Sequence, residues 1–193
     1  MEYPVNLKTL PQRQVACGLA DTFVHVMEQY MTVAGQSRVM DRWAEGILQT
    51  LVEIAPEIRK NQHDYDLMAD FMLSATMGLN GFIAMGVAQD WATHMIGHEL
   101  TALYHLDHAQ TLAVILPALL AERRDSKRAK LLQYAARVWG ITEGSDEQKI
   151  DAAIAKTAAF FESVGLKSSL KSLDIEAAAA DKISSRLEAQ GLT

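Results

Sequence analysis

Residues 12–32 read QRQVACGLADTFVHVMEQYMT, and their apolar side chains recur at steps of three and four residues. The apolar positions are Val15, Ala16, Leu19, Phe23, Val26, Met27, Tyr30 and Met31. This spacing follows the 3.6-residue period of an α-helix, so it gathers these side chains on one face. The stretch therefore predicts an amphipathic helix that packs against an apolar core.

The same helical period runs through the rest of the chain. Further helices are expected over about residues 37–58 and 65–88, from Leu112 to Leu119, over about residues 145–164 and over residues 175–189. Ser145 and Gln148 have the spacing of a capping box, which marks a helix start. Alternating apolar and polar runs, which would indicate strands, are not found at useful length. We therefore predict one all-α domain, a helical bundle of residues 1–193.

The segment of residues 65–88 contains Gly78, Gly81 and Gly86 and is apolar nearly all round. Each glycine costs roughly 1 kcal/mol relative to alanine inside a helix, so close packing between helices is the expected reason for them. A phosphate-binding glycine loop is the alternative. It is disfavoured because no strand precedes the glycines and neither a Gly-Lys-Ser nor a Gly-x-Gly-x-x-Gly pattern is present. A nucleotide site within this chain is therefore not expected.

The charge and apolar content of the sequence limit the kinds of molecule and compartment that fit the chain. The formal net charge of -6 comes from scattered acidic and basic residues, which disfavours nucleic acid as a partner. The longest apolar stretch, residues 111–121, is too short to span a bilayer, and the first residues do not resemble a secretory signal. The single Cys17 cannot form an internal disulfide and lies among apolar neighbours, so an inert thiol in a reducing cytoplasm is expected.

One basic cluster stands out in the second half of the chain. It comprises Arg123, Arg124, Lys127, Arg128 and Lys130. Leu131, Leu132 and Ala135 continue a helical period immediately afterwards, so the cluster is interpreted as the solvated face of a helix. Phosphate binding is the alternative.

Asp21 and His25 are four residues apart, which places both side chains on one face of a helix within reach of a single ion. For this pair alone, a salt bridge beside a core histidine is the preferred interpretation. Four of the six histidines then cluster in one segment, at His94, His98, His105 and His108. Several imidazoles and one carboxylate suit iron(II) or zinc, so a divalent metal site is predicted.

Two regions of the sequence carry a family resemblance. The strings LPQRQ at residues 10–14 and GLADTFVHVMEQY at residues 18–30 resemble the start of the metal-binding domain of iron-containing alcohol dehydrogenases. The strings QDWATHMIGHEL at residues 89–100 and DHAQTLAVILP at residues 107–117 resemble the branch with butanol dehydrogenases and NADPH-dependent aldehyde reductases. The resemblance covers nearly the whole chain. It implies the C-terminal helical domain of a dehydroquinate synthase-like fold.

The resemblance also implies roles for individual residues. The family's site of one aspartate and three histidines falls on Asp21, His25, His94 and His108, and His98 is implied as an active-site residue near the nicotinamide and substrate. His63 and His105 receive no role. The chain departs from the pattern after the last ligand, where many members have glycine and this chain has Ala109.

The activity implied by the resemblance is hydride transfer between NADPH or NADH and a small aldehyde, giving the alcohol. The metal would act as a Lewis acid on the carbonyl oxygen. Family members begin with an α/β nucleotide-binding domain, and this chain is expected to start where that domain ends. We therefore expect the missing domain to be a partner and the isolated chain to be inactive. A homodimer is compatible with this scheme.

Two other functions remain open from the residues alone. A His-Asp type metal-dependent phosphohydrolase would use His25, the dipeptide His63-Asp64 and Asp107, but it leaves His94, His98 and His108 unexplained. A non-catalytic helical binding module would use its histidines only for hydrogen bonds in the core. Metal analysis separates these hypotheses, because each predicts a different ligand set or none.

Overall fold

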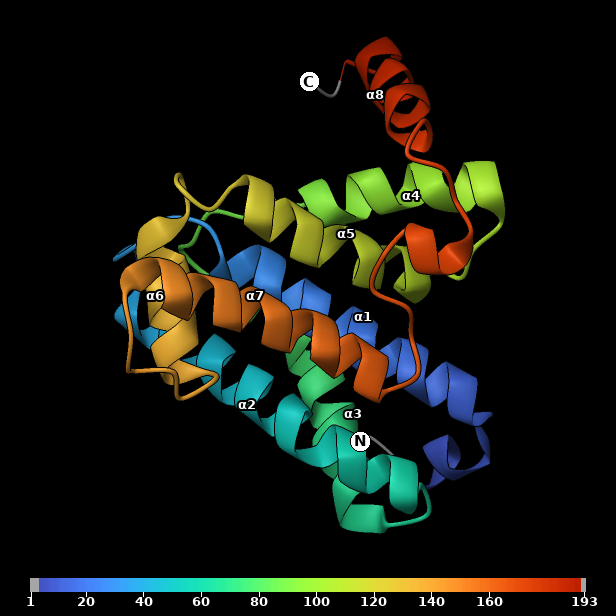
Figure 1. The fold of residues 1–193 in the computed structure, drawn as a ribbon. Helices are drawn as coiled ribbons and strands as arrows, with labels where there is room; N and C mark the ends of the chain where they lie inside the picture. The colour runs from blue at the N-terminus through green and yellow to red at the C-terminus, as the bar shows by residue number, and fades with distance from the viewer. Residues whose placement is uncertain (1–3, 192–193) are drawn as a thin grey trace.

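The computed structural model describes residues 4–191, and these residues form helices and connecting turns with no strand (Figure 1). The elements are η1 (Pro4–Thr9), α1 (Gln12–Tyr30), α2 (Arg38–Lys60), α3 (Tyr65–Leu79), α4 (Ala92–Tyr104), α5 (His108–Glu122), α6 (Arg128–Arg137), α7 (Asp146–Ser163), η2 (Lys171–Leu173) and α8 (Ala179–Ala189). The all-α prediction is confirmed. None of the described helices combines the length and the apolar character needed to cross a membrane.

Helix α1 is the centre of the bundle. It contacts α2, α3 and α5, and Figure 1 shows it between α5 and the pair formed by α2 and α3. Every position of its predicted apolar stripe is buried, and Phe23 stacks on Phe160 of α7 at 4.6 Å between ring centroids. Burial of a large apolar side chain contributes about 1.5–3 kcal/mol. This packing holds α1, which carries Asp21 and His25, in a fixed position.

The third predicted helix is shorter than expected. Helix α3 ends at Leu79, and the prediction of a helix to about residue 88 is wrong. Gly81 and Gly86 have φ values of 87° and 69°, a left-handed backbone that side chains rarely adopt, so they form turns. Close packing holds for Gly78 alone, because a Cβ there would lie 3.5 Å from both Thr22 and Val26 of α1.

The basic cluster of residues 123–130 is paired with acidic side chains from other segments. Arg124 pairs with Glu147 and Asp151, and Arg128 pairs with Asp146 and Glu147. Lys130 is only 2% exposed and binds Asp41 of α2 at 2.6 Å, so the interpretation of a solvated face is wrong for this residue. A charged amine is buried there because a carboxylate compensates it.

Helices α4 and α5 pack closely at one end of the bundle. Gly97 of α4 faces Thr111 of α5, where an added Cβ would approach the Thr111 hydroxyl to 2.9 Å. This close approach brings the histidine-rich helix α4 against the start of α5. Because the two helices lie this close, His94 and His108 can approach each other.

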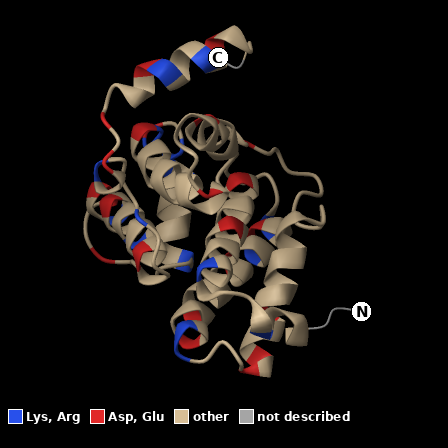
Figure 2. Ribbon diagram, turned by 90° about the vertical axis from the view of Figure 1, so that its right-hand side faces the viewer, with Lys and Arg blue, Asp and Glu red and all other residues tan. Residues whose placement is uncertain are grey.

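The last helices follow the predicted signals with one shift. The capping box of Ser145 and Gln148 is present at the start of α7. Helix α8 begins at Ala179, four residues later than expected, and it stands apart from the rest of the bundle (Figure 2). It contacts α4, where Arg186 and Gln190 bind the buried Glu99. The colouring of the ribbon in Figure 2 also shows acidic and basic residues interspersed along the helices.

Candidate metal centre

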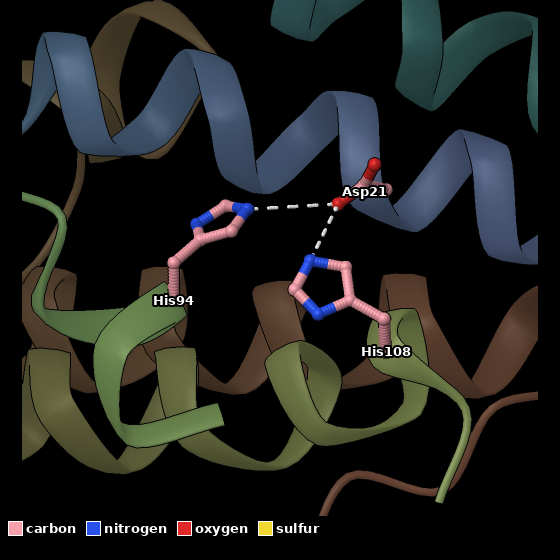
Figure 3. A group of neighbouring side chains, drawn as sticks. All are labelled: Asp21, His94 and His108. Atoms are coloured by element: carbon pink, nitrogen blue, oxygen red, sulfur yellow. Dashed lines mark ion pairs between the residues drawn. The ribbon is translucent and has the colours of Figure 1, made fainter. Parts of the chain in front are cut away.

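Three ligand-type side chains meet where α1, α4 and α5 come together (Figure 3). Asp21 points from α1 toward His94 of α4 and His108, the first residue of α5. Asp21 Oδ1 lies 3.7 Å from His94 Nε2 and 3.5 Å from His108 Nε2, and the three ligand atoms all lie within 4.8 Å of one another. These separations are longer than a normal hydrogen bond of about 3 Å.

The facing atoms of Asp21 and His94 have no hydrogen-bond partner among the described residues. Asp21 Oδ1 and His94 Nε2 are inaccessible to solvent and make no hydrogen bond among the described residues. Buried polar atoms are normally satisfied, so such a pair requires an explanation. Two ligands that each lie about 2.1 Å from one ion at the tetrahedral angle are about 3.4 Å apart, close to the observed separations. The residues therefore fit a divalent metal ion.

His25 lies beside this group. Its Nδ1 is 3.8 Å from Asp21 Oδ2, and its ring stacks on His94 with centroids 4.7 Å apart and planes inclined by 10°. Among residues 4–191, the group of mutually close ligand atoms contains Asp21, His94 and His108 but not His25. Three of the four predicted ligands therefore come together, and the role of His25 stays a prediction.

His98 is exposed one turn after His94 on α4. Its ring centroid lies 5.1 Å from that of His108 and 6.2 Å from that of His94. It is therefore next to the candidate metal centre and open to solvent, and its role at the active site stays a prediction.

The other candidate residues lie apart from this group. His63 and His105 are exposed, and His105 ends α4 with a left-handed backbone. Asp64 caps α3 by accepting hydrogen bonds from the backbone N–H groups of Asp66 and Leu67. The residues required by the phosphohydrolase hypothesis are therefore not gathered into one metal site among the described residues.

Glu28 is a residue of this site that the sequence analysis left without a role. Its carboxylate is 4% exposed, and Oε2 contacts His94 Nδ1. Its Oε1 accepts hydrogen bonds from the backbone N–H groups of Thr93 at 2.6 Å and His94 at 3.2 Å. Glu28 follows Asp21 by seven residues and His25 by three, so helical spacing alone would have placed it on the same face.

Opposing effects set the charge of these groups. Burial opposes protonation of His94, but the carboxylates of Asp21 and Glu28 outweigh burial and raise its pKa to about 9. Burial is also the largest influence on His25 and His108, and it lowers the pKa of each despite the nearby Asp21. Burial would raise the pKa of Asp21, but the surrounding histidines outweigh it and lower that pKa. His25 and His108 are therefore neutral near pH 7, the form that binds metals.

A cavity of about 310 Å³ opens beside Asp21 and His108. Its lining comprises Gln14, Cys17, Gly18, Asp21, Asp107, His108 and Ala109. Burial raises the pKa of Cys17, which keeps the thiol protonated and agrees with the expectation of an inert cysteine. An ion pair of 2.8 Å between Arg13 and Asp107 ties the start of α1 to the start of α5 at this cavity.

Comparison with known proteins places the chain in a family. The model of the family described as "Fe-containing alcohol dehydrogenase family, C-terminal" matches residues 15–190 of the chain. The chain therefore belongs to the Fe-containing alcohol dehydrogenase family and corresponds to its C-terminal part. This agrees with the resemblance seen in the sequence.

Individual relatives refine this placement. The chain is 55% identical over 190 residues to the NADPH-dependent aldehyde reductase YqhD of Escherichia coli (strain K12), covering 98% of this chain and 49% of that protein. It is 33% identical over 190 residues to the probable NADH-dependent butanol dehydrogenase 1 of Bacillus subtilis (strain 168), covering 97% of this chain and 49% of that protein. The chain thus spans about half the length of the curated relatives it matches.

Solved structures have the same fold. The substrate- and cofactor-free form of the E. coli aldehyde reductase YqhD superposes with a TM-score of 0.96 at 54% identity, covering 98% of this chain and 50% of that one. The NADH-dependent butanol dehydrogenase A from Thermotoga maritima superposes with a TM-score of 0.90 at 29% identity, covering 98% of this chain and 47% of that one. The bundle is therefore the helical half of the family's fold.

Proposed function

We propose that this chain is the metal-binding half of an oxidoreductase that interconverts small alcohols and aldehydes with NADPH or NADH. The observation that carries the proposal is the pair of buried, unpartnered atoms, Asp21 Oδ1 and His94 Nε2, which face each other beside His108. Family membership supports it, as do two relatives named as an NADPH-dependent aldehyde reductase and a probable NADH-dependent butanol dehydrogenase.

The proposed ligands of one divalent ion are Asp21, His25, His94 and His108. One carboxylate and three imidazoles suit iron(II) or zinc. His25 shares a helix face with Asp21 and stacks on His94, so it is the nearest candidate for the fourth ligand. The single carboxylate offsets part of the positive charge of the ion.

The ion, when bound, supplies Lewis-acid polarisation of the substrate oxygen. Asp21 and His108 line the 310 Å³ cavity, which would admit a small substrate next to the ion. His98 is proposed to deliver a proton from a ring nitrogen to the product alkoxide, because its ring is exposed and adjacent to His108. The nicotinamide cofactor would be bound by a nucleotide-binding half, since the relatives are about twice as long as this chain.

Zinc titration of the full chain tests the metal site. We expect one tightly bound ion per chain, with affinity strongly reduced by His94→Ala or His108→Ala and unchanged by His63→Ala, an exposed histidine. Equal losses in all three variants would refute the proposed ligand set.

An activity assay tests the proposal that this chain binds the metal and a separate nucleotide-binding half binds the cofactor. The isolated chain loaded with metal should not oxidise NADPH in the presence of butanal, because hydride transfer needs the reacting atoms held about 3–3.5 Å apart. Adding the nucleotide-binding half of a relative, fused or as a separate chain, should restore turnover, and His108→Ala should remove it. Turnover by the isolated chain would show that the cofactor binds here, and failure of a folded, metal-loaded fusion would refute the assigned activity.

A further inference from the structure

Glu28 is a buried carboxylate whose partners all come from the start of α4. Its two oxygens contact the backbone N–H groups of Thr93 and His94 and the Nδ1 atom of His94. Among the described residues, no Lys or Arg nitrogen pairs with it, although a carboxylate that is 4% exposed requires compensation. The compensation therefore comes from three N–H donors of a neighbouring helix.

Two of these donors are the second and third backbone N–H groups of α4, which begins at Ala92. These are the groups that an N-cap side chain normally satisfies. The residue in the N-cap position, Trp91, makes no such side-chain hydrogen bond. Glu28 thus caps α4 from another helix, and its negative charge lies at the favourable positive end of the helix dipole.

The third contact orients the imidazole of His94. An ionised carboxylate only accepts hydrogen bonds, so in the neutral form of the ring, which is the form that binds a metal, the proton lies on Nδ1 and the lone pair of Nε2 is free. The free Nε2 is the buried atom that faces Asp21 Oδ1 (Figure 3). A carboxylate that holds the remote ring nitrogen of a histidine ligand fixes its tautomer and raises its basicity.

We propose that Glu28 is a positioning residue that caps α4 and holds His94 in the tautomer whose Nε2 is free to bind the metal ion. This inference rests on the proposed function, because it assigns Glu28 to the same metal site. The same carboxylate fixes both the helix that carries the ligand and the ring itself. Removal of its charge is therefore expected to weaken metal binding.

Glu28→Gln separates these two tasks. A carboxamide has one oxygen and one NH₂ group, so it cannot accept from both the backbone N–H groups and Nδ1–H. If its oxygen caps α4, its NH₂ faces Nδ1 and favours the tautomer with the proton on Nε2, which blocks the metal. We expect zinc affinity to fall about 10- to 100-fold, the usual effect of losing such a partner. Glu28→Ala loses both tasks and should lower zinc affinity at least as much.

Glu45→Gln is the matched control. Glu45 is also a buried carboxylate, at 6% exposed, but it binds Tyr30, Gln133 and Arg137. Its change should lower thermal stability and leave zinc affinity unaltered.

Nitrogen-15 NMR of the zinc-loaded wild-type chain should show His94 bound through Nε2 with a proton on Nδ1.

The outcomes distinguish this inference from the function on which it rests. Wild-type zinc affinity in Glu28→Gln, or zinc bound through Nδ1 of His94, would overturn the positioning role while leaving the metal site intact. Zinc binding that is insensitive to His108→Ala would instead overturn the proposed function, and this inference with it.

Discussion

Two clusters of buried charged side chains lie against α1, and they differ in how their polar atoms are satisfied. At the end of α1, Lys130 bonds Asp41 at 2.6 Å and lies over the ring of Tyr30, while Glu45 accepts from Gln133 and Arg137. At the middle of α1, Asp21 and His94 face each other with unpartnered atoms. The first cluster is complete without a ligand, and the second is not. The comparison separates a cluster whose polar atoms are satisfied by protein partners from a group with two buried atoms that lack hydrogen-bond partners.

Breaking the complete cluster should have the largest effect on stability. Lys130→Met leaves Asp41 buried with only Gln133 as a partner, and loss of one member of a buried pair costs about 3–5 kcal/mol. Urea denaturation should show this loss in the free energy of unfolding, with zinc affinity unchanged. The double variant Lys130→Met, Asp41→Leu should recover most of it, because it removes both charges. A loss of zinc affinity in the folded single variant would contradict the separation.

Binding of zinc at Asp21, His94 and His108 should stabilise the protein. A ligand that binds only the folded state at 100 times its dissociation constant adds about 2.7 kcal/mol. We therefore expect zinc at 100 times its dissociation constant to raise the unfolding free energy by about 2.7 kcal/mol in the wild-type chain and in His63→Ala. Urea denaturation measures this change. His108→Ala should abolish the gain. An equal gain in His108→Ala would place the ion elsewhere.

The approach of α4 to α5 should affect both stability and the ligand geometry. In Gly97→Ala, the new Cβ would lie 2.9 Å from Thr111 Oγ1 and 3.1 Å from Leu112 Cδ2. Overpacking costs about 1–3 kcal/mol and the gain in helix propensity returns about 1 kcal/mol, so we expect a net loss of up to about 2 kcal/mol.

Zinc affinity should fall as well in Gly97→Ala, because the two helices carry His94 and His108. Gly46→Ala is the control, since nothing lies within 4 Å of its added Cβ in α2. That variant should be slightly stabilised, with unchanged zinc affinity. Equal behaviour of the two variants, in calorimetric melting and zinc titration, would contradict the packing argument.

Much of the fold could be predicted from the sequence because helical periods and caps are local. The stripe of α1 and the capping box at Ser145 were both predicted and both are present. The end of α3 was missed because apolar residues continue past Leu79, and Ile83 is buried although it lies in a turn. An apolar turn and an apolar helix have a similar sequence pattern, and the positive φ values of Gly81 and Gly86 separate them.

The candidate site was predictable in its ligand types but not in its supporting contacts. Asp21 and His25 share a helix face, which local spacing reveals. Glu28 lies within residues 18–30, one of the stretches that resemble the family, yet its role depends on α4, which starts 64 residues later at Ala92. Lys130 likewise pairs with a carboxylate 89 residues earlier in the chain. Contacts between distant segments decide which charges are buried, and no local period contains that information.

The smallest expected effect concerns Asp90, which connects α4 to the start of α6. Its backbone N–H donates to the Glu28 carbonyl, and its carboxylate pairs at 2.8 Å with Lys127, whose amine also donates to the Met31 carbonyl. Burial would raise the pKa of Asp90, but Lys127 and the Ala92 N–H group outweigh burial and lower it. A carboxyl group with a lowered folded-state pKa adds stability above its unfolded value near 3.8, and this contribution disappears as the pH falls through the folded value.

The unfolding free energy of the wild-type chain should therefore exceed that of Asp90→Asn at pH 6, and the difference should shrink as the pH falls below 3.8. A half-exposed pair is screened by solvent, so we expect a difference of about 0.5–1 kcal/mol. Asparagine keeps an oxygen for the Ala92 N–H group, so the comparison isolates the charge. Glu57→Gln, which breaks an exposed pair with Lys60, should show almost no difference at either pH. A difference for Asp90→Asn that stays undiminished as the pH falls below 3.8 would mean that hydrogen bonding, and not the ion pair, fixes the start of α4.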